Sequence, residues 1–159
     1  MWKAGHSLIK AKMKEEGALL AGEMSGHIFF GHRWFGFGDG IYSSARLLEL
    51  VSRTDRPVSA LLSDVPRTFS TPEIRVDCPE DLKFEVVRRA QAFFAARYQA
   101  VTVDGVRVTF PDGWGLVRAS NTQPLLVLRF EARTPERLAE IQGLVAGKVE
   151  ELKREVGAA

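Results

Sequence analysis

Apolar residues recur at spacings of three and four in several stretches of the chain, a pattern typical of amphipathic helices. It predicts helices over residues 6–16, about 39–51, 79–97 and from Thr134 onward, and a short helix over 59–65. Gly17 should end the first helix, and Thr134-Pro135-Glu136 should start the last. The faces expected to be buried carry Ile41, Ala45, Leu48 and Val51 in the second helix, and Leu138, Ile141, Val145, Val149, Leu152 and Val156 in the last.

Short apolar runs bounded by turn residues predict strands between these helices. The expected strands are 18–21, 27–30, 73–78, 99–103, 105–110, 114–118 and 125–132. Asp104-Gly105 and Asp112-Gly113 are hairpin signals, so the strands around them should pair antiparallel.

The order of these elements predicts an α+β fold in two parts. Residues 72–159 should form a C-terminal α+β domain, with an antiparallel four-stranded sheet covered by two helices. Residues 1–55 offer too few strands for a complete α/β unit, and they are interpreted as the C-terminal part of an α/β domain. Three prolines and many hydroxyl residues after position 52 favour a linker, placed at 56–71.

Composition narrows the function classes. The 159 residues are 45% hydrophobic with a net charge of +2, a balance that gives no electrostatic case for nucleic acid or membrane surfaces as partners. No apolar run approaches the roughly 20 residues that span a bilayer. The one cysteine, Cys78, cannot form an internal disulfide, and a cytoplasmic location is expected.

The stretch RASNTQP, residues 118–124, places hydrogen-bonding side chains at a turn between two apolar strands. Arg118 offers a planar fork of donors suited to phosphate or carboxylate, and Ser120, Asn121 and Thr122 add further donors. A tight turn there would also aim backbone N–H groups at an anion. The stretch therefore predicts a phosphate-monoester site, with a solvated loop that satisfies only its own backbone as the alternative.

A second polar turn is GEMSGH, residues 22–27, between two predicted strands. Glu23 and Ser25 can bind sugar hydroxyls, and His27 can transfer a proton near neutral pH. One alternative is a polar hairpin tip; another is a metal site built from Glu23, His27, His32 and His6.

Two further signals are weaker. No acidic run suited to Mg²⁺ is present, so the sequence shows no magnesium site. The aromatic run 33–37 suits stacking on a sugar or a base, or packing at a domain seam.

GEMSGH followed by RASNTQP resembles the sugar-binding and phosphate-binding loops of the α-D-phosphohexomutases, most closely the bacterial phosphomannomutase/phosphoglucomutase group. WKAGHSLIK at 2–10 and DGVRVTFPDGWGLVRASN at 104–121 support the resemblance. Ala4 departs from it, because relatives often have Thr there. The resemblance implies the end of the third domain and all of the fourth domain of a four-domain enzyme.

The resemblance also implies roles for the residues. Glu23, Ser25 and His6 would bind the sugar, His27 would be a possible proton-transfer group, and Arg118, Ser120, Asn121 and Thr122 would hold the phosphate. The intact enzyme would interconvert hexose 6-phosphate and hexose 1-phosphate through a phosphoserine. Both the phosphoserine and the Mg²⁺ site would belong to N-terminal domains outside this chain, which alone should be inactive. A free-standing phosphosugar-binding module is the alternative.

Overall fold

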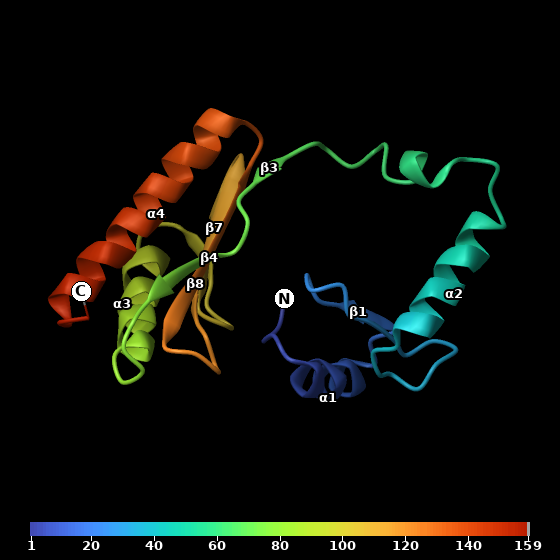
Figure 1. The fold of residues 1–159 in the computed structure, drawn as a ribbon, viewed down its shortest axis with the longest axis horizontal. Coiled ribbons are helices and arrows are strands. Elements are labelled where there is room, and N and C mark those ends of the chain that lie inside the picture. Colours follow the sequence, from blue (N-terminus) through green and yellow to red (C-terminus); the bar gives the residue numbers. More distant parts are fainter. Residues whose placement is uncertain (159) are drawn as a thin grey trace. The chain divides into compact units, whose positions relative to one another are not determined.

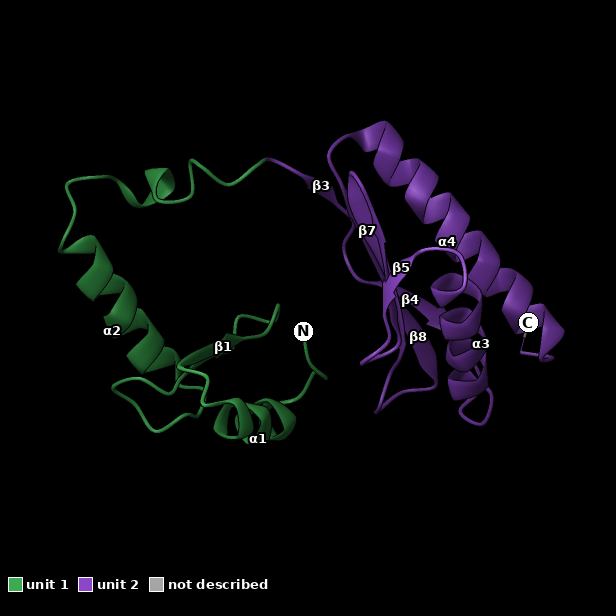
Figure 2. Ribbon diagram, turned by 180° about the vertical axis from the view of Figure 1, so that it is seen from behind, with its two compact units in different colours: residues 1–66 green, residues 67–159 purple. Residues whose placement is uncertain are grey.

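The computed structural model describes residues 1–158. They divide into two compact units, which Figure 2 colours separately: residues 1–66, and the described residues from Arg67 onward. None of the helices over residues 1–158 has the length and apolar character that a membrane crossing requires.

The first unit contains two helices and one small hairpin (Figure 1). Its elements are α1 (His6–Glu16), β1 (Leu20–Gly22), β2 (Ile28–Phe30), α2 (Gly40–Val51) and the 3-10 turn η1 (Val58–Ala60). The helix predicted over 6–16 is confirmed, and Gly17 ends it with a left-handed φ of 63°. The helix predicted over 59–65 is wrong, because only three residues adopt a 3-10 turn there.

The core of the first unit is small. Ile9 and Met13 of α1 pack with Phe29 of β2, and Ala18 and Ala21 pack against them. This cluster fixes α1 against the β1–β2 hairpin, and therefore fixes both ends of the GEMSGH turn relative to the helix that begins with His6.

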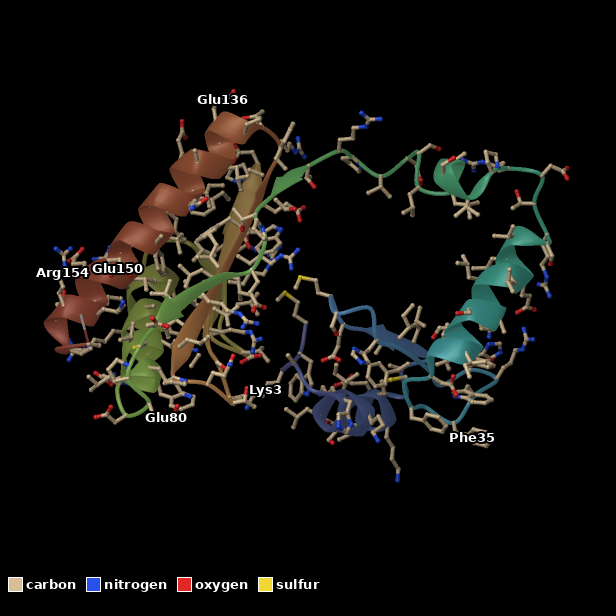
Figure 3. All side chains as sticks on the ribbon, viewed as in Figure 1. Lys3, Phe35, Glu80, Glu136, Glu150 and Arg154 are labelled. Carbon is tan, nitrogen blue, oxygen red and sulfur yellow. The ribbon has the colours of Figure 1, made fainter. Side chains whose placement is uncertain are left out.

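Helix α2 forms where it was predicted, but its predicted burial is wrong. Asp39 caps it by accepting a hydrogen bond from the Tyr42 N–H at 2.9 Å. No residue of α2 is buried, and Ile41 and Leu48 are 87% and 68% exposed. Figure 3 labels Phe35 in the preceding loop, which is 81% exposed. Helix α2 thus carries an exposed apolar face, and Phe35 is a further exposed apolar side chain in the loop before it.

The second unit is an antiparallel sheet with two helices. Its strands are β3 (Phe69–Ser70), β4 (Ile74–Asp77), β5 (Gln99–Val101), β6 (Val106–Phe110), β7 (Gly113–Ala119) and β8 (Leu125–Ala132). The strand order is β3-β8-β7-β6-β5, and β4 pairs with β8 as well. The helices are α3 (Lys83–Ala95) and α4 (Pro135–Glu155).

The sheet has six strands, not the predicted four. Both β3 and β4 pair with β8, β3 at Glu131 and Ala132 and β4 over Leu125–Leu128. The two-residue strand β3 lies in the stretch whose composition suggested a linker, because its pairing is supplied by a strand far along the chain. Helix α3 begins at Lys83, later than the predicted Pro79, because Pro79–Leu82 form a turn first.

Both helices of this unit cover one face of its sheet, as Figure 1 shows. Alternate residues of β8, Leu126, Leu128 and Phe130, are buried in that core with Val86 and Phe94 of α3 and Val145 of α4. The opposite face of the sheet carries the other residues of β7 and β8, among them Arg118 and Arg129, because strand side chains alternate between faces.

Candidate functional site

The GEMSGH turn brings three predicted site residues together. The Ser25 hydroxyl lies 2.8 Å from Nδ1 of His27, and Glu23 Oε2 lies 3.9 Å from the same nitrogen. Backbone hydrogen bonds shape the turn: the Glu23 N–H donates to the His27 carbonyl, and the Gly26 N–H donates to the Glu23 carbonyl. Gly26 has a φ of 86°, which favours glycine. A carboxylate, a hydroxyl and an imidazole therefore converge on one tight turn.

Glu23 also fixes the start of α1. Its Oε1 accepts a hydrogen bond from the Gly5 N–H at 2.8 Å, and Gly5 is the residue that caps this helix. The Glu23 side chain is 17% exposed, whereas that of His27 is 63% exposed. Glu23 is thus a half-buried anchor that presents its second oxygen toward His27, and His27 is the accessible member of the group.

A cavity of about 530 Å³ lies beside these residues. It is lined by Gly5, His6, Lys10, Glu23, His27, Phe29, Phe37 and Gly38. His6 therefore lines the same cavity as Glu23 and His27, whereas Ser25, the third residue predicted to bind the sugar, does not line it. Lys10 was not singled out from the sequence, although its position one helical turn after His6 could have indicated it.

The structure does not support the alternative of a metal site at the GEMSGH turn. Within residues 1–158, no group of three or more His, Cys, Asp or Glu side chains is placed to hold a metal ion. His32 lies beyond β2, where its backbone N–H donates to the Leu19 carbonyl.

The RASNTQP loop joins β7 to β8 and is closed by its own hydrogen bonds. The Ser120 N–H donates to the Leu125 carbonyl at 3.0 Å, and the Leu125 N–H donates to the Gln123 carbonyl at 2.9 Å. The Ser120 Oγ, on a residue only 8% exposed, accepts from the backbone N–H groups of Thr122 and Gln123. Ser120 therefore shapes the turn, and its hydroxyl proton is what it has left to offer a ligand.

Arg118 precedes this turn on the sheet face opposite the helices. It is half-buried and pairs in register with Val127 of β8. Among residues 1–158, its guanidinium has no hydrogen-bond or ion-pair partner. Asn121 and Thr122 follow at the exposed tip of the loop. The strand end thus presents an unpaired cation next to polar side chains, an arrangement that suits a phosphate group.

Two family models match the chain. Residues 1–69 match "Phosphoglucomutase/phosphomannomutase, alpha/beta/alpha domain III", and residues 73–148 match the C-terminal domain of the same family. The chain is 59% identical to a phosphomannomutase/phosphoglucomutase of Pseudomonas aeruginosa over 89% of its own length and 31% of the relative's. It is 51% identical to a phosphoglucomutase of Neisseria gonorrhoeae, over 94% of its length and 33% of the relative's.

A solved structure shows the same fold. A phosphoglucomutase/phosphomannomutase family protein from Burkholderia thailandensis superposes with a TM-score of 0.85 and 47% identity, covering 100% of this chain and 33% of that one. The chain therefore spans about a third of the length of the relatives it matches. Together the two models cover most of the sequence and confirm the resemblance, and the chain belongs to the phosphoglucomutase/phosphomannomutase family, of which it carries part of domain III and the C-terminal domain.

Proposed function

We propose that this chain is the substrate-binding C-terminal part of a phosphohexomutase that interconverts hexose 6-phosphate and hexose 1-phosphate, with mannose or glucose as the sugar. Residues 1–55 would be the C-terminal part of the third domain and 72–159 the phosphate-binding domain, joined by the stretch 56–71, of which Phe69 and Ser70 form β3 of the second unit's sheet. Phosphoryl transfer of this kind depends on positioning and charge stabilisation, which are what these two loops would supply.

The observation that carries the proposal is the unpaired guanidinium of Arg118, a half-buried residue, beside a turn in which the Ser120 Oγ already accepts the Thr122 and Gln123 N–H groups. A half-buried cation without a partner loses part of its hydration, and a bound dianion would offset that loss. Arg118 would form a charge-assisted bond to the phosphate that is not reacting. Asn121 and Thr122 would add donors, and Ser120 would add its hydroxyl proton.

At the sugar end, Glu23, Ser25 and His6 would bind ring hydroxyls. Ser25 contacts Nδ1 of His27, which leaves Nε2 as the ring nitrogen directed to the substrate. His27 would then transfer a proton to or from the reacting sugar oxygen while Glu23 holds its orientation.

The remaining parts of the reaction would come from the N-terminal domains of the same enzyme, which are the partners of this chain. They would supply the phosphoserine and hold Mg²⁺, which stabilises the charge on the transferring phosphoryl group. The exposed apolar face of α2, with Ile41 and Leu48, is the surface we assign to contact with them. The chain alone would be inactive, and the enzyme would be cytoplasmic.

A chimaera tests this function. The chain would replace the matching region of the Pseudomonas aeruginosa relative, and conversion of mannose 6-phosphate and glucose 1-phosphate would be measured. The chimaera should be active, and Arg118→Ala should lower kcat/KM by about 10- to 150-fold, the value of a hydrogen bond to a charged group. Arg129→Ala is the matched control, because Arg129 lies on the same sheet face one strand away. Equal effects of the two substitutions would remove Arg118 from the phosphate site.

A binding measurement on the isolated chain distinguishes this function from that of a free-standing binding module. Micromolar binding of mannose 6-phosphate to the 159 residues, lost in Arg118→Ala, would support the module. Weaker binding with no turnover is the result expected here, because the two loops lie in separate units.

A further inference from the structure

Lys83 is a buried cation next to the RASNTQP loop. It is 0% exposed, although lysine is almost never fully buried without a partner. Its Nζ lies 2.6 Å from Glu80 Oε1 and 5.1 Å from the centre of the Phe84 ring. Nζ also donates to the Gln123 carbonyl at 3.0 Å, across 40 positions of the chain. Glu80 is labelled in Figure 3, just before α3.

This position is an unfavourable one for a lysine. Lys83 is the first residue of α3, where the positive end of the helix dipole repels a cation. Burying an ammonium group also removes its hydration. The Glu80 side chain is itself 67% exposed, so this ion pair with a largely solvated carboxylate is a weak reason for placing the ammonium in the interior.

The Gln123 carbonyl is the contact that distinguishes Lys83. The same carbonyl accepts the Leu125 N–H, and the next carbonyl, that of Pro124, accepts the Cys78 N–H at 3.1 Å. Two anchors from the β4–α3 region therefore hold the exit of the loop. Its entry is held from inside by Ser120. Of the anchors on the exit side, Lys83 is the charged one, and it acts on the carbonyl next to Thr122.

We propose that Lys83 is a positioning residue for the phosphate loop: it holds the Gln123 carbonyl so that Asn121 and Thr122 are fixed beside Arg118. This inference rests on the proposed phosphate-binding role of the loop. Lys83 does not touch the phosphate. It lowers the number of conformations that the loop loses on binding, and preorganisation of that kind appears as affinity.

Lys148 offers a matched control within the same domain. Its side chain is 15% exposed, its Nζ lies 2.7 Å from Glu151 three residues away, and it stands 4.3 Å from the centre of the Phe93 ring. It therefore repeats the ion pair and the ring contact of Lys83 without a loop carbonyl. A purely structural role for buried lysine stems would make Lys83→Met and Lys148→Met behave alike.

The experiment uses the 159-residue chain with two readouts. Amide hydrogen exchange at Gln123 and Leu125 reports the order of the loop without any ligand. Titration with inorganic phosphate, followed by the amide signals of residues 120–123, reports affinity. In Lys83→Met we expect both amides to exchange about tenfold faster, and phosphate affinity to fall about tenfold. In Lys148→Met both should stay within about twofold of the wild type.

Each outcome decides the inference. Unchanged exchange at Gln123 and Leu125 in Lys83→Met overturns it, as does an equal change in Lys148→Met. If the wild-type chain binds no phosphate while Lys83→Met loosens the loop, the positioning role stands and the phosphate role of the loop fails. Should Lys83→Met not fold, Lys83→Gln, which keeps a donor but is one atom shorter, carries the same two readouts and the same expected result.

Discussion

Gly105 should tolerate no side chain, because it lies against the backbone of the strand that carries Arg118. It occupies the turn between β5 and β6 with a φ of 70°. A Cβ atom added there would stand 2.1 Å from the Val117 carbonyl oxygen and 2.7 Å from the Arg118 Cα. Both are main-chain atoms, so no side-chain rotation relieves the overlap and β7 itself must shift.

Two terms set the magnitude for Gly105→Ala. The left-handed backbone costs an alanine roughly 1–2 kcal/mol. Displacing packed backbone costs about 1–3 kcal/mol more, the usual range for overpacking. The free energy of unfolding of the C-terminal unit should therefore fall by about 2–5 kcal/mol.

Urea unfolding followed by circular dichroism measures this loss, and α4 supplies the control. Gly143 and Gly147 lie within α4, and apart from the helix's own backbone and the adjacent residues, an added Cβ would meet no atom within 4 Å at either. The same glycine-to-alanine change there should raise stability by about 0.5–1 kcal/mol. A Gly105→Ala variant within about 0.5 kcal/mol of the wild type would refute the clash argument.

Three further predictions concern the same unit. Hydrogen bonds from Arg88, and then from Arg89, lower the pKa of Glu85 to about 2. The ionised Glu85 therefore stabilises the fold fully above its ordinary pKa of 4.5, and this stabilisation is lost as the pH falls through about 2. Glu85→Gln should flatten that part of the stability profile in urea unfolding, and an unchanged slope would contradict it. Burial raises the pKa of the Cys78 thiol, so labelling by dithionitrobenzoate at pH 8 should be at least about tenfold slower in the folded chain than in urea. Thr134→Ala removes the hydroxyl that accepts the Arg137 N–H and should lower the free energy of unfolding, measured in urea, by about 1 kcal/mol. An unchanged free energy of unfolding would show that this cap does not stabilise the fold.

Local signals in the sequence predicted most elements of the second unit. Asp104-Gly105 and Thr134-Pro135 act through their own backbone preferences, and the turn and the helix start they predict both form. The strand β3 carries no such signal. Its pairing depends on Glu131 and Ala132 of β8, which are too distant in the sequence to be predicted from the residues around β3.

The exposed face of α2 shows a second limit. The spacing of its apolar residues predicts a face suited to burial, and Ile41 lies on that face. The spacing does not show which other surface would cover the face. At the candidate site, residue types predicted the donors of the loop. The contact of Lys83 with the Gln123 carbonyl was not predicted, because it depends on how α3 meets the β7–β8 loop.

The pairing of β8 also bears on how the chain is synthesised. Asp77 pairs with Leu125 and Phe69 with Ala132, so these partners are translated 48 and 63 residues later. At about 5–20 residues per second, β4 and β3 spend roughly 2–13 s as unpaired edges on the ribosome. During that time the sheet of this unit lacks the strand with which β3, β4 and β7 all pair, and unpaired strand edges of this kind are sites at which chains aggregate.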